Sequence, residues 1–262
     1  MKHTTLFSTL ALAALLSPSV HAETAYAING RQLLVRFDTN TPAFTDDSKI
    51  IRGLQPGESI LGIDFRPANG TLYGLGSHNR LYTIDVSTGI ASPVGSAPFA
   101  TPLQGTEFGF DFNPTVDRIR VVSNTGQNLR LHPDTGAVAA VDGPLNSDSM
   151  APYRIVGAAY TNSVAGATTT VLYGIDAELR ALVTQNPPND GKLNPVGMMN
   201  IDMSEVAGFD ISPRSGVAFV VARVRGSAMA ALWEVNLSTG ATMQLGTFDR
   251  LDQVGALAIP GR

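Results

Sequence analysis

One pattern of apolar and polar positions recurs along this chain. It has the form apolar-x-Gly-x-Asp-apolar-x-Pro, and it is clear at residues 60–67, 108–114 and 207–213 and weaker at 156–160 and 254–260. The glycine of the pattern stands at positions 62, 109, 157, 208 and 255, so its spacing is 47, 48, 51 and 47 residues. A period of this size is typical of architectures built from repeated units.

Three further apolar segments follow each copy of the pattern. In the first full copy they are residues 71–75, 80–85 and 90–94, which are rich in β-branched, aromatic and leucine side chains. Short segments of this kind predict β-strands. A turn that contains glycine separates the last two strands at 87–89, and its counterparts are 134–136, 189–191 and 238–240. Glycine allows the positive φ that a tight antiparallel connection needs.

The two ends of the chain complete one repeat between them. Residues 255–262 suffice for only the first strand of a repeat, whereas residues 23–61 begin with the second strand, at 26–28, followed by the third at 33–38. We therefore predict an all-β, five-bladed β-propeller with four strands per blade, closed by pairing of the C-terminal strand with the N-terminal strands. A closed ring leaves only short, protected strand edges. The alternative, an open β-solenoid, would need polar caps, and neither end resembles one.

The first 22 residues have the pattern of a secretory signal peptide. Lys2 precedes an apolar stretch at 6–16, and Val20-His21-Ala22 has the small residues of a cleavage site. The apolar stretch is shorter than the roughly 18 residues that span a bilayer. We expect cleavage after Ala22, a single propeller domain over residues 23–262, no membrane span in the mature chain, and a periplasmic or secreted location.

Composition narrows the classes of partner. The formal net charge is −4, and Lys and Arg form no basic cluster, so nucleic acid and anionic membranes are poor candidates. The chain has no cysteine, which excludes disulfides, thiolate catalysis and cysteine-ligated zinc. We expect a monomer whose partner is an unknown extracellular or periplasmic ligand or protein.

One segment carries a resemblance to a known family. Residues 109–136, GFDFNPTVDRIRVVSNTGQNLRLHPDTG, together with 158–163 and 185–191, resemble an uncharacterised family of exported bacterial proteins catalogued as domain of unknown function 4394. The resemblance extends over essentially the whole mature chain. It implies a single exported repeat domain, and it brings no activity, ligand or catalytic residue with it.

Three acidic residues are the sharpest candidates for chemistry. Asp64, Asp111 and Asp210 occupy equivalent positions on three inner strands, where the other two repeats have Ala159 and Leu257. The carboxylates are candidates for a calcium site, or for a glycosidase-like acid/base group together with a loop glutamate, Glu107 or Glu205. A structural alternative is that each aspartate binds backbone amides of the next blade. Because the residue repeats with the period of the fold, the structural interpretation is favoured.

Other polar residues gather in the predicted loops and in the third repeat. The long connections between blades lie on the same face as the turns between the second and third strands, and loops on a rigid scaffold commonly carry function. The ligand-binding candidates on that face are His78, Asn79, Asn124, Gln127 and Asn128. Asp117, Arg118 and Arg120 are predicted to be structural, in ion pairs between blades.

No recognisable catalytic set emerges from the motifs. The two histidines outside the signal segment, His78 and His132, lack HExxH spacing, and the chain has no GxSxG or GxGxxG motif. The leading hypothesis is an exported binding or scaffolding module without a confident metal or cofactor site. The alternatives are a glycan-active enzyme that uses the inner-strand carboxylates and a calcium-binding structural module.

Overall fold

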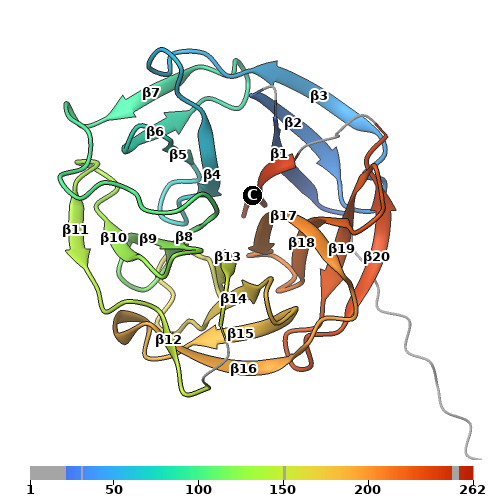
Figure 1. Ribbon diagram of the computed structural model, residues 1–262. Coiled ribbons are helices and arrows are strands. Elements are labelled where there is room, and N and C mark those ends of the chain that lie inside the picture. Colours follow the sequence, from blue (N-terminus) through green and yellow to red (C-terminus); the bar gives the residue numbers. More distant parts are fainter. Residues whose placement is uncertain (1–21, 31, 150–151, 250–253, 262) are drawn as a thin grey trace, which may run out of the picture.

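Five β-sheets surround a central axis in the computed structural model, which describes residues 22–30, 32–149, 152–249 and 254–261 (Figure 1). Blade 1 has the order β21-β1-β2-β3 from the axis outward. Its strands are β21 (Val254–Ala258), β1 (Thr24–Asn29), β2 (Leu33–Asp38) and β3 (Thr45–Ile50). The sequence prediction of a five-bladed propeller with four strands per blade is confirmed.

The other four blades follow in chain order. Blade 2 consists of β4 (Ile60–Phe65), β5 (Leu72–Gly76), β6 (Arg80–Ile84) and β7 (Ala91–Val94), and blade 3 of β8 (Phe108–Asn113), β9 (Arg118–Ser123), β10 (Asn128–Leu131) and β11 (Val138–Val141). Blade 4 consists of β13 (Ile155–Tyr160), β14 (Leu172–Asp176), β15 (Ala181–Gln185) and β16 (Lys192–Met198), and blade 5 of β17 (Met203–Ile211), β18 (Ala218–Val224), β19 (Ala230–Val235) and β20 (Thr242–Thr247). A short strand, β12 (Asn146–Ser147), adds to β16 in parallel, and a 3-10 turn, η1 (Pro188–Asp190), precedes β16.

The ring closes inside blade 1. There β21 pairs antiparallel with β1, with Tyr26 opposite Ala258 and Ala27 opposite Leu257. The first and last strands of the chain therefore lie side by side near the axis (Figure 1). Because both ends of the chain are needed for one sheet, closure joins the termini through backbone hydrogen bonds.

The hydrophobic core lies between the blades. Aromatic pairs cross three of the blade interfaces with edge-on geometry: Tyr26–Phe65, Phe37–Phe248 and Tyr73–Phe112, with ring centroids 5.5, 5.1 and 5.1 Å apart. Such pairs contribute about 0.5–1.5 kcal/mol each beyond the burial of their area. Each blade is thus stabilised chiefly by its two neighbours.

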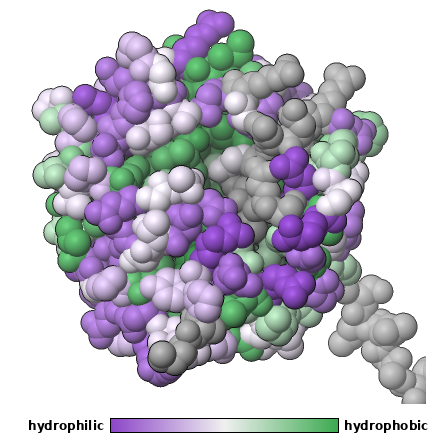
Figure 2. Space-filling model, in the orientation of Figure 1, coloured by the Kyte–Doolittle hydropathy of each residue, from purple (hydrophilic) through white to green (hydrophobic). Residues whose placement is uncertain are grey.

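The outer surface is mixed in polarity. Polar side chains predominate on the face drawn in Figure 2, with apolar ones showing between them. The large exposed apolar residues of the described part are spread over all five blades, for example Phe44 in blade 1, Val116 in blade 3 and Met198 in blade 4. Among the described residues no helix has the length and apolar character needed to cross a membrane.

The repeated glycine allows the inner strands to approach one another. A Cβ atom on Gly109 would lie 2.6 Å from the backbone nitrogen of Ala158, and one on Gly62 would lie 2.6 Å from the Cβ of Phe110. Both neighbours belong to the next blade. Gly255 differs, because the nearest atom to its added Cβ is the Ile28 oxygen at 3.7 Å.

Replacing Gly109 by alanine should therefore destabilise the ring. The added methyl meets backbone of the next blade, which cannot rotate away, so we expect Gly109→Ala to lower the free energy of unfolding by about 1–3 kcal/mol in chemical denaturation. Gly255→Ala is the matched control, and its effect should stay below about 1 kcal/mol. Equal losses in the two variants would contradict close packing as the reason for the glycine.

Candidate functional site: an axial carboxyl cluster and the cavity beside it

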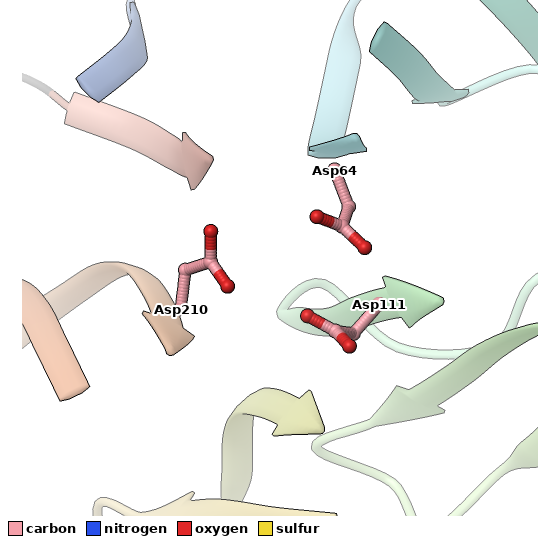
Figure 3. A group of neighbouring side chains, drawn as sticks. All are labelled: Asp64, Asp111 and Asp210. Atoms are coloured by element: carbon pink, nitrogen blue, oxygen red, sulfur yellow. The ribbon is translucent and has the colours of Figure 1, made fainter. Parts of the chain in front are cut away.

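Three carboxyl groups from three blades converge on the propeller axis. Asp64 lies near the end of β4, Asp111 near the end of β8 and Asp210 near the end of β17, and their side chains point toward one another (Figure 3). One oxygen from each lies within 4.8 Å of the other two. All three are buried, with 4%, 2% and 4% exposure. The structure thus brings together the three residues that the repeat pattern singled out.

Five backbone amides donate hydrogen bonds to these three carboxyl groups. Asp64 accepts from Phe65 N (2.6 Å) and Phe112 N (2.7 Å), Asp111 from Tyr160 N (3.0 Å), and Asp210 from Ile211 N (2.6 Å) and Ile259 N (2.6 Å). Each amide comes from a different blade, since Ile259 directly follows β21. The blades that carry Ala159 and Leu257 instead of an aspartate have their amides bound by Asp111 and Asp210. Three aspartates are therefore sufficient for five blades.

Burial governs the ionisation of this cluster. Loss of hydration raises the pKa of Asp64 and Asp111 well above the usual value for aspartate, and the negative charges of the neighbouring aspartates raise it further. The pKa of Asp210 rises to about 7, mainly through burial, with repulsion from Glu23 adding to it and the two amide bonds opposing it. In the described part of the chain no Lys or Arg forms an ion pair with the cluster. The cluster therefore holds protons at pH values where an exposed aspartate has lost them.

A cavity of about 350 Å³ lies directly beside the cluster. Asp64 and Asp210 form part of its wall, and Asn69 and Ser163 add polar groups. Its apolar lining includes Phe65, Pro67, Val164, Pro213, Ile259 and Pro260. These residues belong to the ends of inner strands and the turns that follow them, so the cavity lies on the face that carries the turns between first and second strands. Farther along the inner strands, a space of only about 20 Å³ remains between residues such as Gly62, Gly109 and Gly208.

The ligand-binding candidates from the sequence lie on the opposite face, and most of them anchor loops. Asn79 Oδ1 accepts from Leu103 N (2.7 Å), and Gln127 bonds the backbone of Gln104 and Pro102. His78 is exposed in the turn between β5 and β6. These contacts position the connection between blades 2 and 3.

The remaining two candidates on that face also make internal bonds. Asn124 bonds the side chain of Glu107 and the backbone of Thr106, and Asn128, which is buried, donates to the carbonyl oxygens of Gly143 and Pro188. Glu107 itself is paired with Arg154 at 2.7 Å. Glu205, which the sequence placed in a loop, lies instead in β17, opposite Arg223 of β18, and its side chain lies outside the described part of the structure.

The charged residues of the third repeat connect blades. Asp117 forms a bidentate ion pair with Arg66 of blade 2, and Arg66 also binds Asp134. Arg118 donates to the carbonyl oxygen of Asp117 at 2.8 Å and forms no ion pair with a described residue. The role of Arg66 was not evident from the sequence, because a single arginine after an inner strand has no distinctive pattern.

Arg120 is the most deeply buried of these cations, at 2% exposure. It pairs with Asp142 at 2.6 Å and donates to Asn128 at 2.7 Å within blade 3. Two further bonds reach blade 4, to Asn189 at 2.8 Å and to the hydroxyl of Tyr160 at 3.4 Å. All of its guanidinium nitrogens are thus used, and they connect two blades.

The cavity could have been anticipated from one detail of the repeat. The pattern ends in proline, and three of these prolines, Pro67, Pro213 and Pro260, line the cavity. A proline at the same position in several repeats places rigid apolar surface around the axis. The sequence does not show, however, that the turns leave open space between them.

These observations define a class: a five-bladed β-propeller with buried carboxyl groups on its axis and a cavity at one axial end. The chain belongs to the family described as Domain of unknown function (DUF4394), whose model matches residues 33–258. No functionally curated protein matches the sequence.

Two solved structures show the same fold. A structural genomics protein of unknown function from Bacteroides thetaiotaomicron has a TM-score of 0.55 at 13% identity, and the match covers 85% of this chain and 57% of that one. The chain therefore spans little more than half of that protein's length. The glutaminyl cyclase of Myxococcus xanthus has a TM-score of 0.51 at 14% identity, with 87% and 97% covered. At such identities the likeness shows the fold alone.

The axial cluster should make stability depend on pH. The pKa of Asp210 is raised from 3.8 to about 7, so the folded chain keeps a proton that the unfolded chain releases. This contribution to stability is fully present below about pH 4 and is lost as the pH rises toward 7, with a slope of up to about 1.4 kcal/mol per pH unit. Asp210→Asn should reduce the slope in urea titrations, and Asp64 and Asp111, whose pKa values are also raised, account for the slope that remains.

Asp148→Asn is a suitable control for that measurement, because the side chain of Asp148 is 92% exposed. Its slope should match that of the unmodified protein. An undiminished slope in Asp210→Asn would show that Asp210 does not take up the proton.

Arg120 and Arg118 should differ in their contribution to stability. Arg120→Ala leaves Asp142 buried with only Arg130 as its partner and removes the bonds to blade 4, so we expect a loss of about 3–5 kcal/mol. Arg118→Ala removes bonds to exposed carbonyl groups and should change the free energy of unfolding by less than about 0.5 kcal/mol. Similar losses of unfolding free energy in the two variants, measured by chemical denaturation, would show that the bonds from Arg120 to blade 4 do not stabilise the fold.

Proposed function

We propose that this protein is an exported ligand-binding propeller, and that its ligand occupies the axial cavity. The observation that supports the proposal is the cavity itself: about 350 Å³, with apolar walls and the carboxyl groups of Asp64 and Asp210 at one side. Small-molecule sites are commonly concave, largely apolar and equipped with a few convergent polar groups. The signal-peptide pattern at residues 1–22 supports the exported location.

The chemistry of the walls favours a small organic cation, such as an amine with an apolar body. No described Lys or Arg forms an ion pair with the cluster, so a positive group of a ligand near Asp210 would be attracted to its ionised form. The prolines and Phe65 offer surface for the apolar part of the ligand. Because the pKa of Asp210 is about 7, such a cation would bind the ionised form and displace a proton.

The two alternatives receive less support from the geometry. A calcium ion takes six to eight oxygen ligands, whereas five of the six carboxyl oxygens of the cluster already accept an amide hydrogen bond. A glycosidase-like mechanism needs carboxyl groups that reach the sugar, whereas Asp64 and Asp210 in the cavity wall are each 4% exposed and use both carboxyl oxygens to accept amide hydrogen bonds. Calcium and oligosaccharides therefore serve as comparison ligands in the test.

The test is a thermal-shift panel of amines, neutral polyols, oligosaccharides and calcium, followed by titration calorimetry on any amine that raises the melting temperature. A ligand at 100 times its Kd stabilises the folded state by about 2.7 kcal/mol. We expect stabilisation by amines and tighter binding at pH 8 than at pH 6. A shift by oligosaccharide or calcium alone, or a panel without any shift, would contradict the proposal.

Two matched variants locate the site. Val164 lines the cavity and Val116 does not, although both are exposed in turns, at 45% and 54%. Val164→Trp should weaken amine binding at least tenfold by filling the mouth, whereas Val116→Trp should leave the Kd unchanged. Equal Kd values in the two variants would place the ligand elsewhere.

A further inference from the structure

Glu23 is the first buried residue in the described part of the chain. This residue is 3% exposed, whereas Ala22 before it is exposed. The backbone nitrogen of Glu23 donates to Thr39 Oγ1 at 3.1 Å, and its carbonyl oxygen accepts from Thr39 N at 2.9 Å. Its carboxyl group accepts a hydrogen bond from the hydroxyl of Ser212 in blade 5. Glu23 thus links blade 1 to blade 5 at the point of ring closure.

This structural boundary coincides with the cleavage site that the sequence pattern indicates. Val20-His21-Ala22 precedes the 22–23 peptide bond, which is the bond between the last exposed and the first buried residue. Hydrolysis of that bond adds hydroxide to the Ala22 carbonyl carbon and leaves an amine on Glu23, which takes up a proton. A backbone N–H with one donor is thereby replaced by an ammonium group with three.

The new positive charge would form on Glu23, whose nitrogen lies beside the Thr39 hydroxyl and whose carboxyl group contacts Ser212, two residues after Asp210. The carboxylate of Glu23 is near enough to Asp210 to raise its pKa by repulsion, and the Asp210 charge in turn acts on Asp64 and Asp111. None of the ion pairs between described residues includes any of these four groups. Buried charges are stabilised strongly by a nearby opposite charge because solvent screens them little.

We propose that removal of the leader after Ala22 creates a buried N-terminal ammonium group that acts as the positive counter-charge of Glu23 and the axial carboxyl cluster. Cleavage then changes the charge inside the folded domain as well as removing the signal peptide. It adds a positive charge to the contact that Glu23 makes between blades 1 and 5, which otherwise consists of hydrogen bonds. The processed chain is therefore more stable than a chain that still carries residues before Glu23.

The first measurement is the intact mass of the protein recovered from a bacterial host that exports it. We expect a chain that starts at Glu23. A start at any other residue would overturn the proposal, because the ammonium group would then lie outside the buried position.

The second measurement compares two purified forms: one that starts at Glu23, produced from a fusion whose protease leaves no extra residue, and one that carries Gly-Ser-Ala before Glu23. The extension moves the ammonium group into solvent and keeps the backbone N–H at Glu23. We expect its melting temperature to be lower by about 2–4 °C, the shift that corresponds to roughly 1 kcal/mol for a domain of this size.

The same pair of forms in the Asp210→Asn background separates charge from steric effects. Removing the Asp210 charge should reduce the difference between the two forms to less than half, because the ammonium group has lost one of its partners. An undiminished difference would show that the extension acts by crowding, and equal melting temperatures in the unmodified background would show that the ammonium group has no role. Either result overturns the proposal.

Discussion

The propeller depends on how five inward-facing backbone amides are satisfied at its axis. A buried N–H group without a partner is costly, and the ring places one such group from each blade close to the axis. Two of the carboxyl groups, Asp64 and Asp210, each accept from two blades, and Asp111 accepts from the remaining blade. These bonds connect every blade to the cluster, so the axis acts as a common point of attachment.

The same arrangement has an electrostatic cost. Burial raises the pKa values of the three carboxyl groups, and repulsion from neighbouring carboxylates raises them further. The repulsion is offset in part by the amide donors, whose dipoles point at the oxygens. The net result is a negative electrostatic potential at the axial end of the cavity. Both the proposed cationic ligand and the N-terminal ammonium group would be attracted to it.

The residues that repeat from blade to blade also form the axial cluster and part of the cavity wall. The glycine two residues before each aspartate lets neighbouring inner strands approach, and the proline three residues after two of them shapes the cavity. A residue such as Asp64 is at once a structural acceptor and part of a cavity wall. The polar residues on the opposite face, for example Asn79 and Gln127, form side-chain hydrogen bonds with the connections between blades.

The amino-acid sequence by itself determined the number of blades, the strand order and the closure of blade 1, because the 47-residue period and the incomplete repeats at 23–61 and 255–262 are properties of the chain alone. It also marked Asp64, Asp111 and Asp210 as equivalent. Only the tertiary structure decided how three aspartates serve five blades, that Arg66 pairs with Asp117, and that open space lies beside the cluster. The bonds join residues 48 to 51 positions apart, and the cavity is lined by residues between 64 and 261. The distances in space are set by how the blades pack, and no local pattern encodes them.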